Sequence, residues 1–184
     1  MDLSNSFVHL SGVVLGKTDA SDADLDSLVK CRRIEFLNLS HTRLTDRGLA
    51  KLEALKQLWY LDVSGTSISA AGVRSITTLP RLTYLSVADT PASDEAIAVL
   101  TESRTLEHLD VSGTAITDDA IASIQRLPTL RGLFARNTAL TDQAALATRQ
   151  FKSLSHLDYS GCPISDVGVA GITALSDLEG SRHC

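Results

Sequence analysis

Histidine, aspartate and serine recur in two short segments in the combination that nucleophilic hydrolases use. The three residues stand at alternate positions each time: His108, Asp110 and Ser112, then His156, Asp158 and Ser160. Such an enzyme needs a hydrogen bond of about 3 Å between its nucleophile and its base. Alternate residues of an extended strand stand about 7 Å apart, and no glycine-rich oxyanion loop accompanies these segments. The sequence therefore predicts no catalytic residues and no enzyme.

Carboxylates at the same repeat position raise the question of a metal site. Asp62, Asp110 and Asp158 follow each other at intervals of 48 residues, which places them two strands apart, or about 10 Å, if successive repeats stack as a parallel sheet. A calcium ion needs its oxygen ligands at about 2.3–2.6 Å. We therefore predict no metal and no cofactor. The row is either a solvated polar face or a contact for lysine and arginine on a basic partner surface, and the sequence leaves both open.

The elements that position these side chains follow from an internal repeat. The apolar pattern LxxLxL begins every 24 residues without insertion or deletion, at Leu10, Ile34, Leu58, Leu82, Leu106, Leu130 and Leu154. Apolar residues at the fourth and sixth positions of each repeat alternate with polar ones, which is typical of a half-buried strand. Threonine fills the ninth position in six repeats, and Cys162 in the seventh. We expect each hydroxyl to bond the backbone where the chain leaves the sheet.

The second half of each repeat predicts a short helix. Its twelfth position is always Ser or Thr, which predicts a helix N-cap: Ser21, Thr45, Ser69, Ser93, Thr117, Thr141 and Ser165. The next residue is Asp in six repeats, and Ala70 is the exception. A carboxylate there suits the positive end of the helix dipole. On the same spacing we expect Cys31 to face the core, and repeat six, with Thr148 and Phe151 at apolar positions, to be the loosest.

Stacking seven such repeats predicts a curved α/β solenoid, because strands stack at about 4.8 Å and helices at about 8–10 Å. The expected fold is a right-handed horseshoe with a parallel sheet on its concave face and helices on its convex face. Residues 10–177 form the seven repeats. Residues 1–9 are expected to be a lead or partial cap, and residues 178–184 the start of an incomplete eighth repeat.

The pattern LxxLxLxxTxITDxGLxxLxxL resembles the leucine-rich-repeat superfamily, in particular 24-residue bacterial repeats, and is similar to the GALA and cysteine-containing subtypes. Those subtypes occur in ubiquitin-ligase adaptors and in effectors that pathogenic bacteria inject into host cells. The resemblance covers residues 10–177 and implies protein binding, with no more specific role.

Composition narrows the class of partner. The net charge is −5, with 17 basic and 22 acidic side chains, so we expect no nucleic-acid or membrane partner. No apolar stretch approaches the length of a membrane span, and no signal peptide is visible. Three cysteines without regular spacing fit a reducing compartment. The expected location is therefore the cytoplasm, or a host cell if the protein is an effector.

The third and fifth strand positions alternate with the buried ones and must face the concave surface. They place an aromatic row beside the acidic row described above. The residues predicted to contact a partner are Phe36, Trp59, Tyr60, Asp62, Tyr84, His108, Asp110, Phe134, His156 and Asp158. Solvent-facing Trp and Tyr are enriched at binding hot spots, although such aromatics also stabilise neighbouring strands.

The predicted function is accordingly a protein-interaction module that binds a protein or peptide on its concave face, as the recognition part of an effector or a ubiquitin-ligase adaptor. The alternative is a structural scaffold or self-associating segment, in which the uncapped ends hold copies together weakly. The module itself is otherwise expected to be a monomer.

Overall fold

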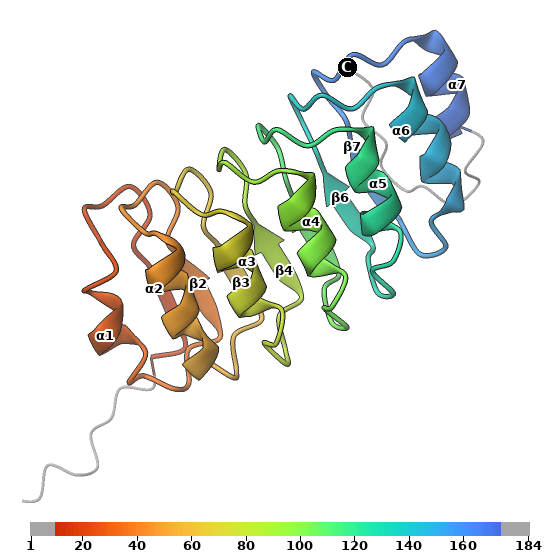
Figure 1. Ribbon diagram of the computed structural model, residues 1–184. Coiled ribbons are helices and arrows are strands. Elements are labelled where there is room, and N and C mark those ends of the chain that lie inside the picture. Colours follow the sequence, from red (N-terminus) through yellow and green to blue (C-terminus); the bar gives the residue numbers. More distant parts are fainter. Residues whose placement is uncertain (1–9, 174–184) are drawn as a thin grey trace, which may run out of the picture.

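The computed structural model describes residues 10–173 as one solenoid of seven repeats. One parallel sheet contains the strands in chain order: β1 (Gly12–Val14), β2 (Phe36–Asn38), β3 (Tyr60–Asp62), β4 (Tyr84–Ser86), β5 (His108–Asp110), β6 (Gly132–Phe134) and β7 (His156–Asp158). The helices form a second layer along one side of the sheet (Figure 1): α1 (Leu25–Leu28), α2 (Asp46–Lys51), α3 (Ala70–Ile76), α4 (Asp94–Leu100), α5 (Asp118–Ile124), α6 (Asp142–Ala147) and α7 (Asp166–Thr173). The predicted α/β solenoid is confirmed. The expected segments 1–9 and 178–184 lie outside the described residues.

The 24-residue period sets the register of the sheet. Each strand residue pairs with the residue 24 positions later, as Phe36 does with Tyr60 and Tyr60 with Tyr84. The fourth and sixth positions are fully buried in the central repeats and form a continuous core with the helices. In a parallel sheet, side chains at paired positions of neighbouring strands point to the same face and lie side by side. This register therefore also aligns the third and fifth positions across all seven repeats.

Threonine at the ninth position closes the turn after each strand, as predicted. In six repeats its hydroxyl donates to the carbonyl three residues earlier, at 2.5–2.9 Å. In the seventh repeat the Cys162 thiol instead contacts the carbonyl of Ala135 in repeat six, at 3.0 Å. No described buried side-chain nitrogen or oxygen lacks a hydrogen-bond partner.

The predicted cap residue directly precedes the helix in six repeats but not in the first, and in repeat four the Ser93 side chain forms no cap hydrogen bond. Helices α2 to α7 begin directly after the predicted Ser or Thr. Helix α1 begins only at Leu25, with Asp24 as its N-cap, and Ser21 donates its N–H and hydroxyl to the Asp24 carboxylate. Cys31 is exposed, whereas Leu55 and Leu79 at the same repeat position are buried. The prediction of a core position for Cys31 is therefore wrong.

The aspartates that follow the predicted cap residues bond to the following repeat, a role that the sequence did not reveal. In five repeats the carboxylate accepts the backbone N–H and the hydroxyl of the Ser or Thr 23 residues later, at 2.5–2.9 Å: Asp22 with Thr45, Asp46 with Ser69, Asp94 with Thr117, Asp118 with Thr141 and Asp142 with Ser165. Ser93 has no such partner, because Ala70 stands in place of the aspartate.

The eighth position of every repeat has a positive φ angle, and its residues alternate with a period of two repeats. Repeats three, five and seven have glycine there, whereas repeats two, four and six have His41, Asp89 and Asn137. Each of these side chains lies over the glycine of the following repeat, so that a Cβ at Gly113 would overlap the Asp89 carboxylate. Glycine therefore relieves backbone strain and leaves room for its neighbour at once.

Repeat six, expected to be the loosest, is filled from repeat seven. Thr148 is fully buried, and its hydroxyl lies 2.9 Å from the Tyr159 hydroxyl and donates to the carbonyl of Ala144. Tyr159 occupies a sixth position that holds Leu or Val in most repeats. The larger side chain fills space beside the small residues of repeat six and remains 8% exposed. Two 3-10 turns, η1 (Leu52–Ala54) and η2 (Thr148–Gln150), extend α2 and α6.

Candidate interaction surface

The sheet face opposite the helices, here called the open face, presents a row of stacked rings at the third strand position. Phe36 stacks on Tyr60 with 4.1 Å between ring centroids and 13° between planes, and Tyr60 stacks on Tyr84 at 4.4 Å and 10°. His108 continues the row at 6.4 Å from Tyr84, tilted by 33°. The register of the sheet puts these residues side by side, so the predicted aromatic row is confirmed as a contact between neighbouring strands. Its role in binding stays a prediction.

Trp59 widens the row at its edge. It precedes β3, and its ring makes edge contacts with Phe36 at 6.3 Å and Tyr60 at 5.8 Å. Trp59 is 42% exposed, the largest exposure of any described aromatic residue, whereas Tyr60 and Tyr84 are half-buried. Since the stacked rings cover each other's faces, the open face presents mainly ring edges and phenol hydroxyls.

Glycines bound the row at both ends. Gly132 follows His108 in the register, and a Cβ there would overlap the His108 imidazole, which extends across it toward His156 at 6.4 Å. At the other end, a Cβ on Gly12 would meet only Cβ of Phe36, at 3.9 Å. The third position of repeat one therefore places no side chain beside the Phe36 ring.

Both tyrosine hydroxyls of the row remain neutral at physiological pH. Burial raises the pKa of Tyr60 above its usual value, and the Asp62 carboxylate adds to the shift. Burial raises the pKa of Tyr84 further, with contributions from Tyr60 and Asp110. The two hydroxyls also interact with each other. Each phenol keeps its proton, and the pair retains hydrogen-bonding capacity for a partner.

The acidic row at the fifth position closes the turns that follow the strands. One oxygen of each of Asp62, Asp110 and Asp158 accepts the N–H of the serine two residues later, at 2.9–3.0 Å. The second oxygen of Asp62 accepts from the Asn38 amide at 2.9 Å. Within the described residues, the second oxygen of Asp110 has no hydrogen bond, so Asp110 is the member of the row most available to a basic partner group.

Asp158 is less accessible than the sequence suggested. It is 9% exposed, and its second oxygen accepts from the Arg136 guanidinium at 2.5 Å. Burial acts to raise the pKa of Asp158, but hydrogen bonds from Ser160 and the charge of Arg136 outweigh it, so the pKa is lowered. Phe134 lies between Asp110 and Asp158 in the register and is half-buried. The predicted contact at Asp158 would require a partner to displace Arg136.

The histidines of the open face do not form hydrolase triads. His156 contacts the Ser155 hydroxyl at 3.0 Å, and that hydroxyl also lies 3.2 Å from the carbonyl of Arg131. Among the described residues, neither His156 nor His108 hydrogen-bonds to an aspartate. Burial lowers the pKa of His108, with Glu107 acting in the opposite direction. His108 is therefore a neutral, half-buried extension of the ring row at physiological pH.

The described part of the chain contains neither a metal-binding cluster nor a membrane-spanning helix. Over residues 10–173, no three His, Cys, Asp or Glu side chains lie close enough together to hold a metal ion. Nor does any helix of that part combine the length and apolar character that crossing a bilayer requires.

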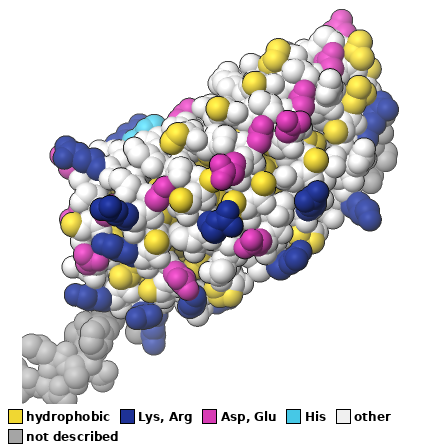
Figure 2. All heavy atoms as spheres, viewed as in Figure 1, with side chains coloured by type: hydrophobic (Ala, Val, Ile, Leu, Met, Phe, Trp, Pro, Cys, Tyr) yellow, Lys and Arg dark blue, Asp and Glu magenta, His cyan; other side chains and the backbone are white. Residues whose placement is uncertain are grey.

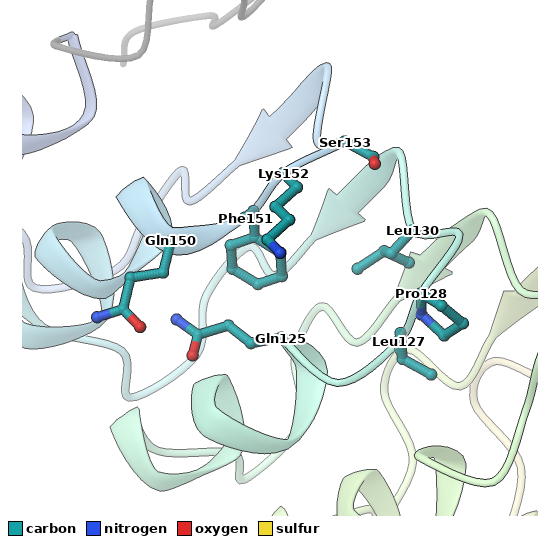
Figure 3. Close-up of a pocket in the computed structure, with 8 residues that line it drawn as sticks. All are labelled: Gln125, Leu127, Pro128, Leu130, Gln150, Phe151, Lys152 and Ser153. Atoms are coloured by element: carbon teal, nitrogen blue, oxygen red, sulfur yellow. The ribbon is translucent and has the colours of Figure 1, made fainter.

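A second surface feature, not foreseen from the sequence, lies where helices end and strands begin. A pocket of about 310 Å³ opens between repeats five and six. It is lined by Gln125, Leu127, Pro128, Leu130, Gln150, Phe151, Lys152 and Ser153 (Figure 3). Phe151 occupies the position of Leu55 and Leu79, which are buried, but is itself half-exposed. A phenylalanine at a leucine position was the available sequence signal.

Comparisons with known proteins agree with this architecture. A family model described as "Leucine Rich repeat" matches residues 30–52 and 102–124. No curated protein matches the sequence. An internalin (inlF) from Listeria monocytogenes is similar in structure, with a TM-score of 0.60 and 19% identity over 94% of this chain and 54% of the internalin chain. Internalin C2 from the same bacterium is similar as well, with a TM-score of 0.61 and 18% identity. That match covers 91% of this chain and 78% of the internalin C2 chain. At this identity the likeness establishes the fold, and the chain spans about half of the first internalin.

Proposed function

The chain is a leucine-rich-repeat solenoid, and we propose that it is an interaction module that binds a protein or peptide on its open face. The observation that supports this proposal is the ring row of Phe36, Tyr60, Tyr84 and His108, with Trp59 at its edge. Four aromatic side chains and an imidazole form one contiguous, half-exposed surface on the open face.

The geometry of the row favours binding over a purely structural role. Stacking on neighbouring strands already fixes the rotamers of Tyr60 and Tyr84, so a partner would lose little side-chain entropy on docking there. The neutral phenols supply hydrogen-bond donors and acceptors beside apolar area, a combination enriched at interface hot spots. Asp110, with one free carboxylate oxygen, lies beside the row and supplies a site for a lysine or arginine of the partner.

The finer predictions follow from the resemblance to leucine-rich-repeat proteins alone. A role as the recognition part of an effector or ubiquitin-ligase adaptor stays a proposal. The second candidate is a scaffold that self-associates through its ends. Exposed Leu10 and Val14, at 42% and 69%, favour it because they form an apolar edge on the first repeat. Sedimentation over a range of concentrations separates the two candidates, since a strict monomer contradicts self-association.

A displayed library of random peptides tests the open face directly. Clones selected on the wild-type protein are tested against the Tyr60→Ala, Tyr84→Ala double variant. We expect these clones to lose binding by tenfold or more, since each hot-spot truncation costs on the order of 2 kcal/mol. Circular dichroism and thermal unfolding check that the double variant is folded.

Two controls make the result specific to the ring edges. The Tyr60→Phe, Tyr84→Phe variant keeps the stack and removes only the hydroxyls, so it should retain part of the affinity. Arg74→Ala alters an exposed residue of α3 and should change nothing. Clones that bind wild type and the alanine double variant equally well would rule out the ring row as the binding surface.

A further inference from the structure

Charged side chains divide between the two long edges of the solenoid. The segments that run from each helix to the next strand hold ten basic side chains: Lys30, Arg32, Arg33, Lys56, Arg81, Arg104, Arg126, Arg131, Arg149 and Lys152. The same segments hold four glutamates. The segments that run from each strand to the first residue of the next helix hold nine aspartates and three basic side chains. We call these the basic edge and the acidic edge. Figure 2, which views the helix side, shows Lys and Arg gathered along the lower edge.

Most aspartates of the acidic edge are engaged within the fold. Five of the nine aspartates accept hydrogen bonds from the following repeat, as described above. On the basic edge Lys56 pairs with Glu53, and Arg81 and Arg149 form hydrogen bonds, but several cations at the C-terminal end of that edge form no ion pair. Arg104, Arg126, Arg131 and Lys152 are exposed, and none of them forms an ion pair with a described residue. Helix dipoles favour cations near helix C-termini, but about half a charge per helix end does not neutralise this row.

The pocket beside Phe151 opens on this same edge. Lys152 is part of its lining, and Arg126 and Arg131 are chain neighbours of its apolar walls Leu127 and Leu130. In Figure 3 the Phe151 ring lies between Gln125 on one side and Leu130 on the other, with Lys152 above it. The volume of the pocket, about 310 Å³, falls at the lower end of the range for ligand pockets, about 300–1,000 Å³. Unpaired cations and a recess that contains the half-exposed Phe151 ring thus adjoin each other.

We propose that the basic edge of repeats four to six binds an acidic segment of a partner protein, with one apolar side chain of that segment in the Phe151 pocket. The carboxylates of such a segment complement Arg104, Arg126 and Lys152, and its apolar side chain replaces water against Phe151. This site is separate from the ring row of the proposed function and does not depend on it.

A protein segment fits these observations better than a nucleic acid. A phosphate backbone would meet the cations but would leave the pocket beside the Phe151 ring unfilled. A long polyanion would also experience repulsion from the nine aspartates of the opposite edge and from the net charge of −5. A short acidic segment confined to one edge avoids most of that repulsion, because charges more than about 10 Å apart are largely screened at 0.1 M salt.

Fluorescence anisotropy tests the proposal with a short fluorescein-labelled peptide of Asp and Glu residues around one central leucine. We expect the peptide to bind the wild-type protein, and we expect its affinity to fall as the NaCl concentration is raised. The Arg126→Glu, Lys152→Glu variant should weaken binding by about tenfold or more, since opposed charges become like charges. The matched Arg47→Glu, Arg74→Glu variant makes the same change of net charge on the helix layer and should leave the affinity within about twofold, because those sites are remote and screened.

Three further arms decide between the proposal and its competitors. Replacing the central leucine of the peptide by serine should weaken binding severalfold, and equal binding would overturn the pocket as the anchor. A fluorescein-labelled single-stranded oligonucleotide of equal charge should bind more weakly, and tighter binding would overturn the choice of a protein segment. The Tyr60→Ala, Tyr84→Ala variant should bind the peptide like wild type. Equal losses in both Glu double variants, or no peptide binding at low salt, would overturn the proposal while leaving the ring row untested by it.

Discussion

The missing aspartate of repeat three offers a direct measure of the bonds that join neighbouring repeats. Ser93 is half-exposed, and its side chain has no hydrogen bond to the N–H groups that begin α4. Ala70→Asp would place a carboxylate where the other repeats already hold one. The new carboxylate would face Ala96. Alanine also stands at that helix position beside Asp94 and Asp118 (Ala120 and Ala144), and both aspartates form the bond to the next repeat. We predict that Ala70→Asp stabilises the protein.

The magnitude follows from the bonds in the intact repeats. Each aspartate there accepts a backbone N–H and a hydroxyl of the next repeat. Hydrogen bonds to charged groups contribute about 1.5–3 kcal/mol when buried, and half-exposure reduces the pair to about 1–2 kcal/mol. The helix dipole adds about 0.3–1 kcal/mol. Repulsion from Asp46 and Asp94, about 8–10 Å away on neighbouring helices, removes about 0.5 kcal/mol each before screening. The net gain is about 1 kcal/mol.

Urea denaturation and thermal unfolding measure this gain. For a chain of this size, 1 kcal/mol corresponds to a rise of about 2–4 °C in Tm. The gain should grow when NaCl is raised, since salt screens the repulsion more than the hydrogen bonds. The m value of the urea curve should be the same in the variant and in wild type. Solenoids can unfold in parts, and a changed m value would mean that the two free energies of unfolding are not comparable.

Ala71→Asp is the matched control. It adds the same charge one helix residue later, where Glu95 and Asp119 form no side-chain bond to the following repeat. The interaction with the helix dipole and the repulsion from neighbouring carboxylates are similar in Ala70→Asp and Ala71→Asp. The two variants therefore differ only in the bonds to Ser93. If the two variants change the free energy of unfolding alike, the cross-repeat bond is not what stabilises these repeats. Ser93→Ala in the Ala70→Asp background should remove the hydroxyl part of the gain.

Three further changes probe the alternating glycines, repeat six and the ring row. Gly113→Ala should lower the free energy of unfolding by about 1–2 kcal/mol, because an L side chain is strained at φ 67° and its Cβ overlaps Asp89; urea curves that match wild type would contradict this. Tyr159→Phe should cost about 1 kcal/mol through the lost bond to Thr148, and a Tm equal to wild type would refute that bond. Burial lowers the pKa of His108, so the unfolded chain takes up that proton first, and stability should fall as pH drops below about 6.5. Thermal unfolding between pH 5 and 8 should show a smaller fall in His108→Gln, and identical profiles would exclude His108 as the cause.

The parts of the fold that were predictable from sequence are those set by one repeat and its neighbour. The pattern beginning at Leu10 and repeating to Leu154 gave the strand positions, the helix starts and the register, and so the row formed by Phe36, Tyr60 and Tyr84. A parallel sheet with an unbroken 24-residue period has one register that buries every fourth and sixth position. That restriction made the open face predictable before any coordinates.

The wrong predictions concern places where the repeat is imperfect. The spacing places Cys31 in the core, but it lies beyond the short α1 and is exposed. Ser21 does not cap α1, because that helix begins only at Leu25. The sequence places Asp158 on the open face but does not reveal its pairing with Arg136, 22 positions earlier in the chain. The spacing of residues within a repeat does not predict which polar side chains of neighbouring repeats form hydrogen bonds or ion pairs.

The 24-residue period by itself determined the solenoid, because every repeat buries the same positions against the same kind of neighbour and no long-range choice remains. Only the tertiary structure decided how polar groups are shared between repeats. The helix-start aspartates bond to the next repeat, His41, Asp89 and Asn137 cover the following glycine, and Phe151 opens a pocket on the basic edge. Those outcomes depend on distances between side chains about one repeat apart in the chain, which stacking sets and periodicity does not specify.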